Sequence, residues 1–198
     1  MPRGSLPRIS VTRMDYQRFY SQLFQPIEER IGPLDPMTIA ALIGFDCGGP
    51  VSLSTVGYGR EKFVTYITCE LAVREEQQAG ASGRYEIMMT CDDEAWARKI
   101  LTKVGQMSME SVFAHGHTVD IGQVVGPEFP LQGLIVEEFA RLAVDGCGYG
   151  ILRLHGVTRP ELEFAMQSSA DELLERLKSA GVFPRTSIHR KKSHEKSG

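Results

Sequence analysis

Apolar residues recur at steps of three and four along the first element that the chain predicts. These positions are Tyr16, Phe19, Tyr20, Leu23, Phe24, Ile27 and Ile31. The spacing predicts an amphipathic helix with one face on a core. Asp15 is the expected N-cap, because its carboxylate can accept hydrogen bonds from the free amides of the first turn. Gly32-Pro33 is the expected end, and Pro26 is expected to kink the helix or divide it in two.

The pattern then changes to alternation, which is typical of strands with two different faces. The segments that alternate are residues 51–58, 63–73 and 84–91. The polar, Gly-rich linker 74–83 predicts that the last two strands form an antiparallel hairpin. Cys69 and Cys91 both fall on apolar faces, which favours buried structural thiols over reactive ones.

A second helix is predicted directly after the third strand. The run Asp92-Asp93-Glu94 supplies a cap and negative charge at the helix N-terminus. Apolar residues then follow at helical spacing, at Trp96, Ile100, Leu101 and Val104. The pattern weakens near Gly105, where a short further helix through residues 109–113 is one option. Residues 115–131 are expected to be mostly loop.

Two more strands and two short helices complete the pattern. Residues 133–140 and 148–157 read as strands. The stretches Thr158-Arg-Pro-Glu161 and Ser169-Ala-Asp-Glu172 match the capping box that begins many helices. The order of helix, strands, helix, strands and helices predicts an α+β fold, a single domain with a mainly antiparallel sheet flanked by helices.

Charge divides the chain unevenly. The 198 residues carry 22 Lys and Arg against 25 Asp and Glu, a net charge of −3. Residues 185–198 contribute +4, so residues 1–184 carry −7. We therefore expect an N-terminal extension over 1–14, a folded domain over 15–184 and a basic, disordered tail over 185–198. An acidic body argues against nucleic-acid binding, which needs a basic face.

The apolar runs and cysteines also limit the class of protein. The longest apolar runs are much shorter than the roughly 20 residues that span a bilayer, and the first residues lack the apolar core of a secretion signal. The four cysteines are isolated, without a CxxC pair. We therefore expect no membrane partner, a cytoplasmic location and free thiols.

One constellation could carry metal chemistry. His115 and His117 lie two residues apart, which would place both imidazoles on the same side of a strand, with Asp120 as an oxygen ligand. This would support a small metal-dependent hydrolase. No further ligand cluster lies nearby in sequence, so a hydrogen-bonded histidine in a turn is the preferred interpretation.

Other chemistry finds little support in the residues. The Gly-rich runs at 44–49 and 145–150 lack the lysine and spacing of a phosphate loop, and no nucleophile elbow is present. Glu137-Glu138 could form an acidic patch for a partner, although a solvated edge is the simpler reading. We expect no catalytic residues, cofactor or resident metal, and hence no enzyme.

Several motifs, taken in order, resemble the suppressor-of-fused domain family, including its bacterial single-domain members. They are Phe63-Val-Thr-Tyr-Ile-Thr68, Gly83-Arg-Tyr-Glu-Ile-Met88, the helix with Trp96, His115-Gly-His-Thr-Val119 and residues 150–163. The resemblance spans residues 35–180. The first motif lacks the family's glycine and the second differs in spacing, whereas Val157-Thr-Arg-Pro-Glu161 fits well.

The resemblance implies a non-enzymatic protein-binding module that sequesters or neutralises a partner protein. The family's namesake restrains transcription factors through strand addition, and bacterial members are thought to be immunity proteins against polymorphic toxins. An acidic body and a free sheet edge would suit a basic toxin domain. The motif residues Arg84, Glu86 and Trp96 are compatible with a partner site or with a buried Arg–Glu pair beside an aromatic ring that only holds the fold together.

Overall fold

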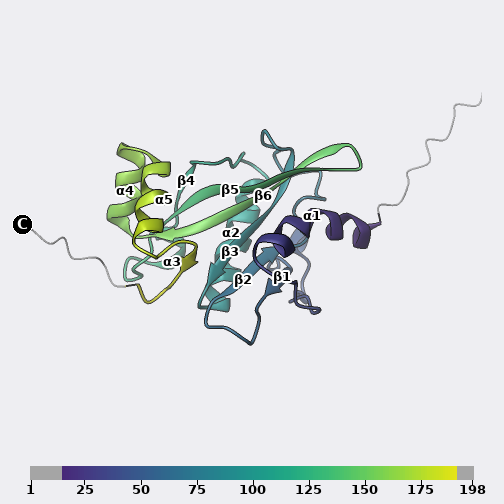
Figure 1. Ribbon diagram of the computed structural model, residues 1–198, viewed down its shortest axis with the longest axis horizontal. Coiled ribbons are helices and arrows are strands. Elements are labelled where there is room, and N and C mark those ends of the chain that lie inside the picture. The colour runs from purple at the N-terminus through teal and green to yellow at the C-terminus, as the bar shows by residue number, and fades with distance from the viewer. Residues whose placement is uncertain (1–14, 191–198) are drawn as a thin grey trace, which may run out of the picture.

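The computed structural model describes residues 15–190, which form one seven-stranded sheet with helices on both faces (Figure 1). The elements are α1 (Tyr16–Arg30), β1 (Leu53–Val56), β2 (Val64–Thr68), β3 (Arg84–Cys91), α2 (Glu94–Ser108), β4 (Thr118–Asp120), α3 (Gly122–Val125), β5 (Gly133–Val144), β6 (Cys147–Val157), α4 (Arg159–Gln167), α5 (Ala170–Ser179) and β7 (Arg185–Thr186), with a 3-10 turn at Phe45–Cys47. The strand order is β1-β2-β3-β6-β5-β4, and β7 pairs with β3. The pairs are antiparallel except where β3 meets β6 and β7. The expected α+β fold with a mainly antiparallel sheet is confirmed.

Helices α1 and α2 cover opposite faces of this sheet. Side chains that alternate along β3 divide between them, because Met88 packs in the cluster under α1 whereas Ile87 and Met89 pack in the cluster under α2. Helices α4 and α5 bury a third cluster at the far end of β5 and β6. The central strands are therefore buried on both sides, and β3 lies at the middle of the molecule (Figure 1).

Local signals placed the helix starts well. The Asp15 carboxylate accepts from the amide of Arg18, and Thr158 and Glu161 form the predicted capping box at the start of α4. Helix α1 runs without a break through Pro26, so the expected division of the helix is wrong. The helix after β3 continues through Gly105 to Ser108. A Cβ at Gly105 would lie 3.2 Å from a Leu71 methyl, so glycine here permits close packing and does not mark a helix end.

The strand expected over residues 63–73 is shorter than predicted and ends at Thr68. The chain then turns, so that the amide of Ala72 points back to the carboxylate of Glu86 at 2.9 Å. Cys69 and Cys91 lie on opposite sides of the sheet. Burial raises the pKa of each of these two thiols to about 12.

The domain extends beyond the boundary expected at residue 184. Arg185 and Thr186 pair with the end of β3, beside the point where β6 separates from it. The Thr186 hydroxyl accepts a 3.1 Å hydrogen bond from the amide of Gly156, which buries this strand against the core. The basic segment therefore begins as part of the sheet. The expected extension 1–14 and the rest of the tail, residues 191–198, lie outside the described residues.

Candidate protein-binding site

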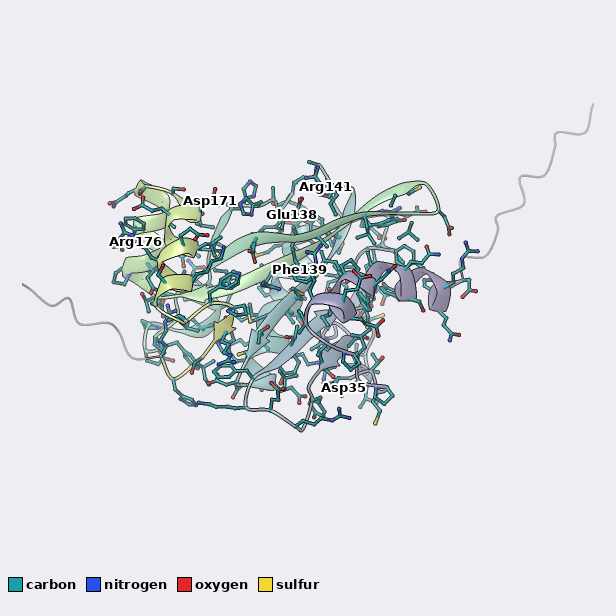
Figure 2. The ribbon with its side chains drawn as sticks, in the orientation of Figure 1. Asp35, Glu138, Phe139, Arg141, Asp171 and Arg176 are labelled. Carbon is teal, nitrogen blue, oxygen red and sulfur yellow. The ribbon has the colours of Figure 1, made fainter. Side chains whose placement is uncertain are left out.

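The three candidate metal ligands do not come together. The His115 Nε2 atom lies 2.8 Å from a carboxylate oxygen of Asp171 on α5 (Asp171 is labelled in Figure 2), and its Nδ1 accepts from the amide of Glu138. Asp120 accepts two hydrogen bonds from Arg159, at 2.7 and 3.2 Å, and these hold the pKa of Asp120 below its usual value. No group of three His, Cys, Asp or Glu side chains within residues 15–190 could hold a metal ion. The structure therefore does not support a metal site of His115, His117 and Asp120.

The Glu137-Glu138 pair does not form a free acidic patch. Glu138 accepts from the Ser82 hydroxyl at 2.6 Å and from Arg141 at 2.9 Å (Figure 2). Glu137 lies on the opposite side of β5 and accepts from the side chains of Arg153 and His155, at 3.4 and 3.2 Å. Both carboxylates are thus used within the fold.

The suspected Arg84–Glu86 pair beside Trp96 is not formed. Glu86 is fully buried under α1, whereas Trp96 lies in the cluster on the other face of the sheet. The donors to the Glu86 carboxylate are the Tyr20 hydroxyl at 2.9 Å, the Thr68 hydroxyl at 2.5 Å and the Ala72 amide at 2.9 Å. Desolvation outweighs these bonds and raises the pKa of Glu86 to about 7. The Tyr20 bond ties α1 to the sheet.

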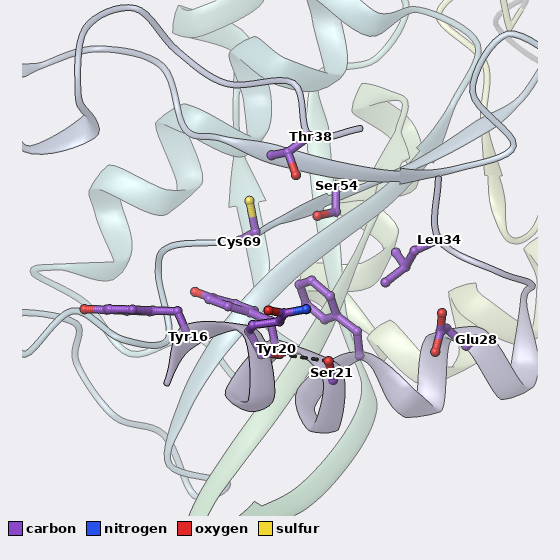
Figure 3. Close-up of a pocket in the computed structure, with 10 residues that line it drawn as sticks. Tyr16, Tyr20, Ser21, Glu28, Leu34, Thr38, Ser54 and Cys69 are labelled. Carbon is purple, nitrogen blue, oxygen red and sulfur yellow. Dashed lines mark hydrogen bonds between the residues drawn. The ribbon is translucent and has the colours of Figure 1, made fainter. Parts of the chain in front are cut away.

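A groove of about 570 Å³ opens beside this bond, between α1 and the segment that precedes β1 (Figure 3). We call it the α1 groove. It is lined by Tyr16, Gln17, Tyr20, Ser21, Phe24, Glu28, Leu34, Thr38, Ser54 and Cys69. Helix α1 forms one wall, and Leu34, Thr38 and Ser54 face it across the opening (Figure 3). Aromatic rings on one wall and small polar groups on the other suit the binding of an extended polypeptide.

The rim of the α1 groove exposes a large aromatic side chain to solvent. Tyr16, which lines the groove, is 57% exposed. Tyrosine is enriched at the centres of protein interfaces. Burial raises the pKa of Tyr20 as well as that of Cys69, so neither group ionises near neutral pH.

The sheet also offers one partly unpaired edge. The outer edge of β1 is occupied, because Asp35 and Ile39 donate amide hydrogen bonds to its carbonyls at 2.8 Å. On the other side of the sheet, β4 pairs only with Gly133–Ile135 of β5. Within the described part of the chain, the length of β5 beyond Phe139 has β6 as its one strand partner. The free edge expected from the sequence therefore belongs to β5.

Sequence reasoning did not identify the α1 groove. Tyr16, Tyr20 and Phe24 were assigned to a stripe that faces the core, and only the last is buried. Tyr16 and Tyr20 lie at the edge of this apolar stripe, and they line the groove instead of packing in the core. An unusually wide apolar face was the available signal.

The fold defines a class of protein, namely an α+β domain with one sheet between helices, and the α1 groove opens on its surface. The family model for Suppressor of fused protein (SUFU) matches residues 49–191. The chain therefore belongs to the SUFU family, which implies a protein-interaction module and is not a known enzyme family.

Solved structures share the fold. One described as "the Sufu-Fu complex crystal structure" has a TM-score of 0.63 at 15% identity and covers 90% of this chain and 89% of that chain. The structure of Drosophila Suppressor of Fused has a TM-score of 0.65 at 17% identity over 87% of this chain. The chain spans about half (49%) of that Drosophila protein. Curated protein sequences include no significant match. None of the described helices is both long and apolar enough to cross a membrane.

Proposed function

We propose that this chain is a non-enzymatic module that sequesters a partner protein, and that the partner docks in the α1 groove. The observation that carries the proposal is the groove itself, with Tyr16 exposed on its rim and Tyr20 anchored below to buried Glu86. A pre-formed groove loses little conformational entropy when it binds, so the exposed rings can contribute fully to affinity. The SUFU protein whose structure is described as a complex with Fu supports a polypeptide as the occupant.

The partner that fits best is basic. Residues 1–184 carry a net charge of −7, and such a surface steers positively charged proteins by long-range attraction. Within the groove, Glu28 adds a carboxylate that can pair with a lysine or arginine. We propose that the partner is a basic toxin domain, that the chain is the matching immunity protein, and that both meet in the cytoplasm. The partly free edge of β5 offers such a partner a second contact by strand addition.

The experiment is a capture from the native host followed by binary binding measurements with the partner so identified. Tyr16→Asp should weaken that binding at least about tenfold, because it removes an exposed ring and places a charge on the rim. Tyr58→Asp is the matched control, since Tyr58 is similarly exposed (47%) but lies outside the α1 groove. Equal affinity of wild type and Tyr16→Asp, or equal weakening by both variants, would refute docking in this groove. Failure of the chain to protect cells that express the partner would refute the immunity role.

A further inference from the structure

A second groove, of about 410 Å³, lies at the C-terminal end of α1. Its lining includes Arg30, Arg153, Arg185, Thr65, Thr90 and Glu61. It shares none of them with the α1 groove. Three arginines line it against one carboxylate, which contrasts with the acidic character of the chain as a whole. We call it the arginine groove.

The register of the strands builds the base of this groove. Val56 pairs with Thr65, Thr65 with Thr90, and Thr90 with Arg185, so these four side chains form one row across β1, β2, β3 and β7. The Thr65 and Thr90 hydroxyls lie 2.8 Å apart and share one hydrogen bond. Because each hydroxyl carries one proton, the pair retains a second donor for a ligand. Arg153 enters from β6, where the adjacent β3 residue in the register is Met88.

Arg153 is the central observation. Its side chain is only 10% exposed, yet the one carboxylate that it contacts within residues 15–190 is Glu137, at 3.4 Å from Nη1. Glu137 also accepts from His155, so Arg153 shares this carboxylate with a second side chain. The Nε atom of Arg153 is buried, and no atom of the described part of the chain forms a hydrogen bond with it. A buried guanidinium normally has well-placed acceptors, because its desolvation is costly.

Two other arginines also have an Nε atom without an acceptor, but their circumstances differ. Arg74 donates to Glu70 at 2.7 Å, and Arg98 donates to the carbonyl of Ala40 at 3.1 Å. Each of them therefore has a hydrogen bond of ordinary length to a protein oxygen. Arg153 has none of that length and is the most deeply buried of the three. The weakly satisfied guanidinium is thus a specific property of the arginine groove.

Aromatic rings hold the arginines in place. The Arg153 guanidinium lies 4.4 Å from the centroid of Phe139, which Figure 2 shows between α1 and the α4–α5 pair, and 5.6 Å from that of Phe183. Arg30 stacks on Phe139 at 5.0 Å and donates to its carbonyl at 2.6 Å. Arg185 lies 5.5 Å from the ring of Phe63. Such stacking orients the planar guanidinium groups and leaves their edges available for oxygen atoms.

We propose that the arginine groove binds an oxyanionic group, either a free anion or a carboxylate that a polypeptide presents. Arg153, Arg30 and Arg185 supply the charge, and the Thr65–Thr90 pair supplies a neutral donor. Arginine forks match the geometry of carboxylate and phosphate oxygens, and the volume suits a small group rather than a folded domain. The site does not depend on the protein-binding role of the α1 groove, because the two grooves have separate residues.

The test is calorimetry at constant ionic strength with three probes, which are inorganic phosphate, succinate and a short blocked peptide with a single aspartate. Saturable binding of any probe supports the site, and the probe that binds most tightly identifies the source of the oxyanion. The double variant Arg30→Gln with Arg185→Gln should weaken that binding at least about tenfold. Arg18→Gln is the matched control, because Arg18 lies at the opposite end of α1 and pairs with Asp145 at 3.1 Å. It should change the affinity by less than about twofold.

Arg153→Lys provides a separate test of geometry, since it keeps the charge but removes the planar fork. It should bind at least about tenfold more weakly than wild type. If this variant fails to fold, as judged by the fluorescence of Trp96, the exposed pair Arg30 and Arg185 still decides the question. Absence of saturable binding by wild type to all three probes would overturn the proposal. So would equal weakening by the double variant and by Arg18→Gln.

Discussion

The buried carboxylate of Glu86 makes the stability of the protein depend on pH in a direction that is unusual for an acidic residue. Its pKa is raised from 4.5 to about 7, chiefly by desolvation. Between these values the folded state holds a proton that the unfolded state has lost. The free energy of unfolding therefore falls as pH rises through this window. The shift of about 2.5 units corresponds to about 3 kcal/mol, at 1.36 kcal/mol per unit.

Glu86→Gln tests this reasoning with little change in shape. The amide oxygen can keep the bonds from Tyr20 and Ala72, while its NH₂ group donates to the Thr68 hydroxyl, which can turn its own proton to the carbonyl of Ile87 at 3.2 Å. All these groups stay paired, but no charge is buried. The free energy of unfolding of wild type should fall relative to that of Glu86→Gln as pH rises. We expect the difference between the two proteins to change by about 3 kcal/mol from pH 4.5 to pH 8.

Urea denaturation at pH 5, 6, 7 and 8 measures the effect, with the single, buried tryptophan, Trp96, as the reporter. Other groups with shifted pKa values, such as His155, titrate alike in both proteins and cancel in the difference. Glu138→Gln is the control. Arg141 lowers the pKa of Glu138 below 4.5, so the stabilising effect of this carboxylate is fully present from pH 5 to pH 8 and is lost only in more acidic solution. The difference between wild type and Glu138→Gln should therefore stay constant across the four pH values. A constant difference between wild type and Glu86→Gln across all four pH values would refute the reasoning.

Two further predictions concern packing and thiol reactivity. Gly156→Ala should lower the free energy of unfolding by about 1–3 kcal/mol, because the new Cβ would lie 2.6 Å from a Thr186 methyl. Chemical denaturation measures this, and an unchanged midpoint would show that β7 does not pack as described. Cys47 and Cys147 are exposed and should react with a disulfide reagent in the folded state. Cys91 is fully buried and should react only after unfolding, so its labelling in native protein at the same rate would contradict the burial described.

Features that depend on neighbours in sequence could be predicted closely. Asp15 and Thr158 cap their helices as expected, because the groups that they bind lie three residues away. The antiparallel pairing of β2 with β3 followed from the turn-forming linker between them. The helix and strand periods placed most elements within a few residues. The acidic body and the family likeness followed from composition and motifs.

Features that depend on distant segments had no such signal. The sequence did not predict the parallel pairing of β3 with β6, nor the pairing of β3 with β7. Each of these pairings joins residues more than 60 positions apart in the chain. Nor did it predict the pairing of Asp120 with Arg159, which occupies the carboxylate of the alternative metal site.

By itself the sequence determined which segments are helix or strand, where the helices begin, and that the chain is an acidic member of a protein-binding family. Only the tertiary structure decided which face each strand turns to α1, and therefore that Glu86 is buried and that Arg30, Arg153 and Arg185 meet in one groove. The reason is physical. Local backbone preference acts over one or two turns of chain, whereas burial and charge pairing depend on which distant surfaces exclude water together.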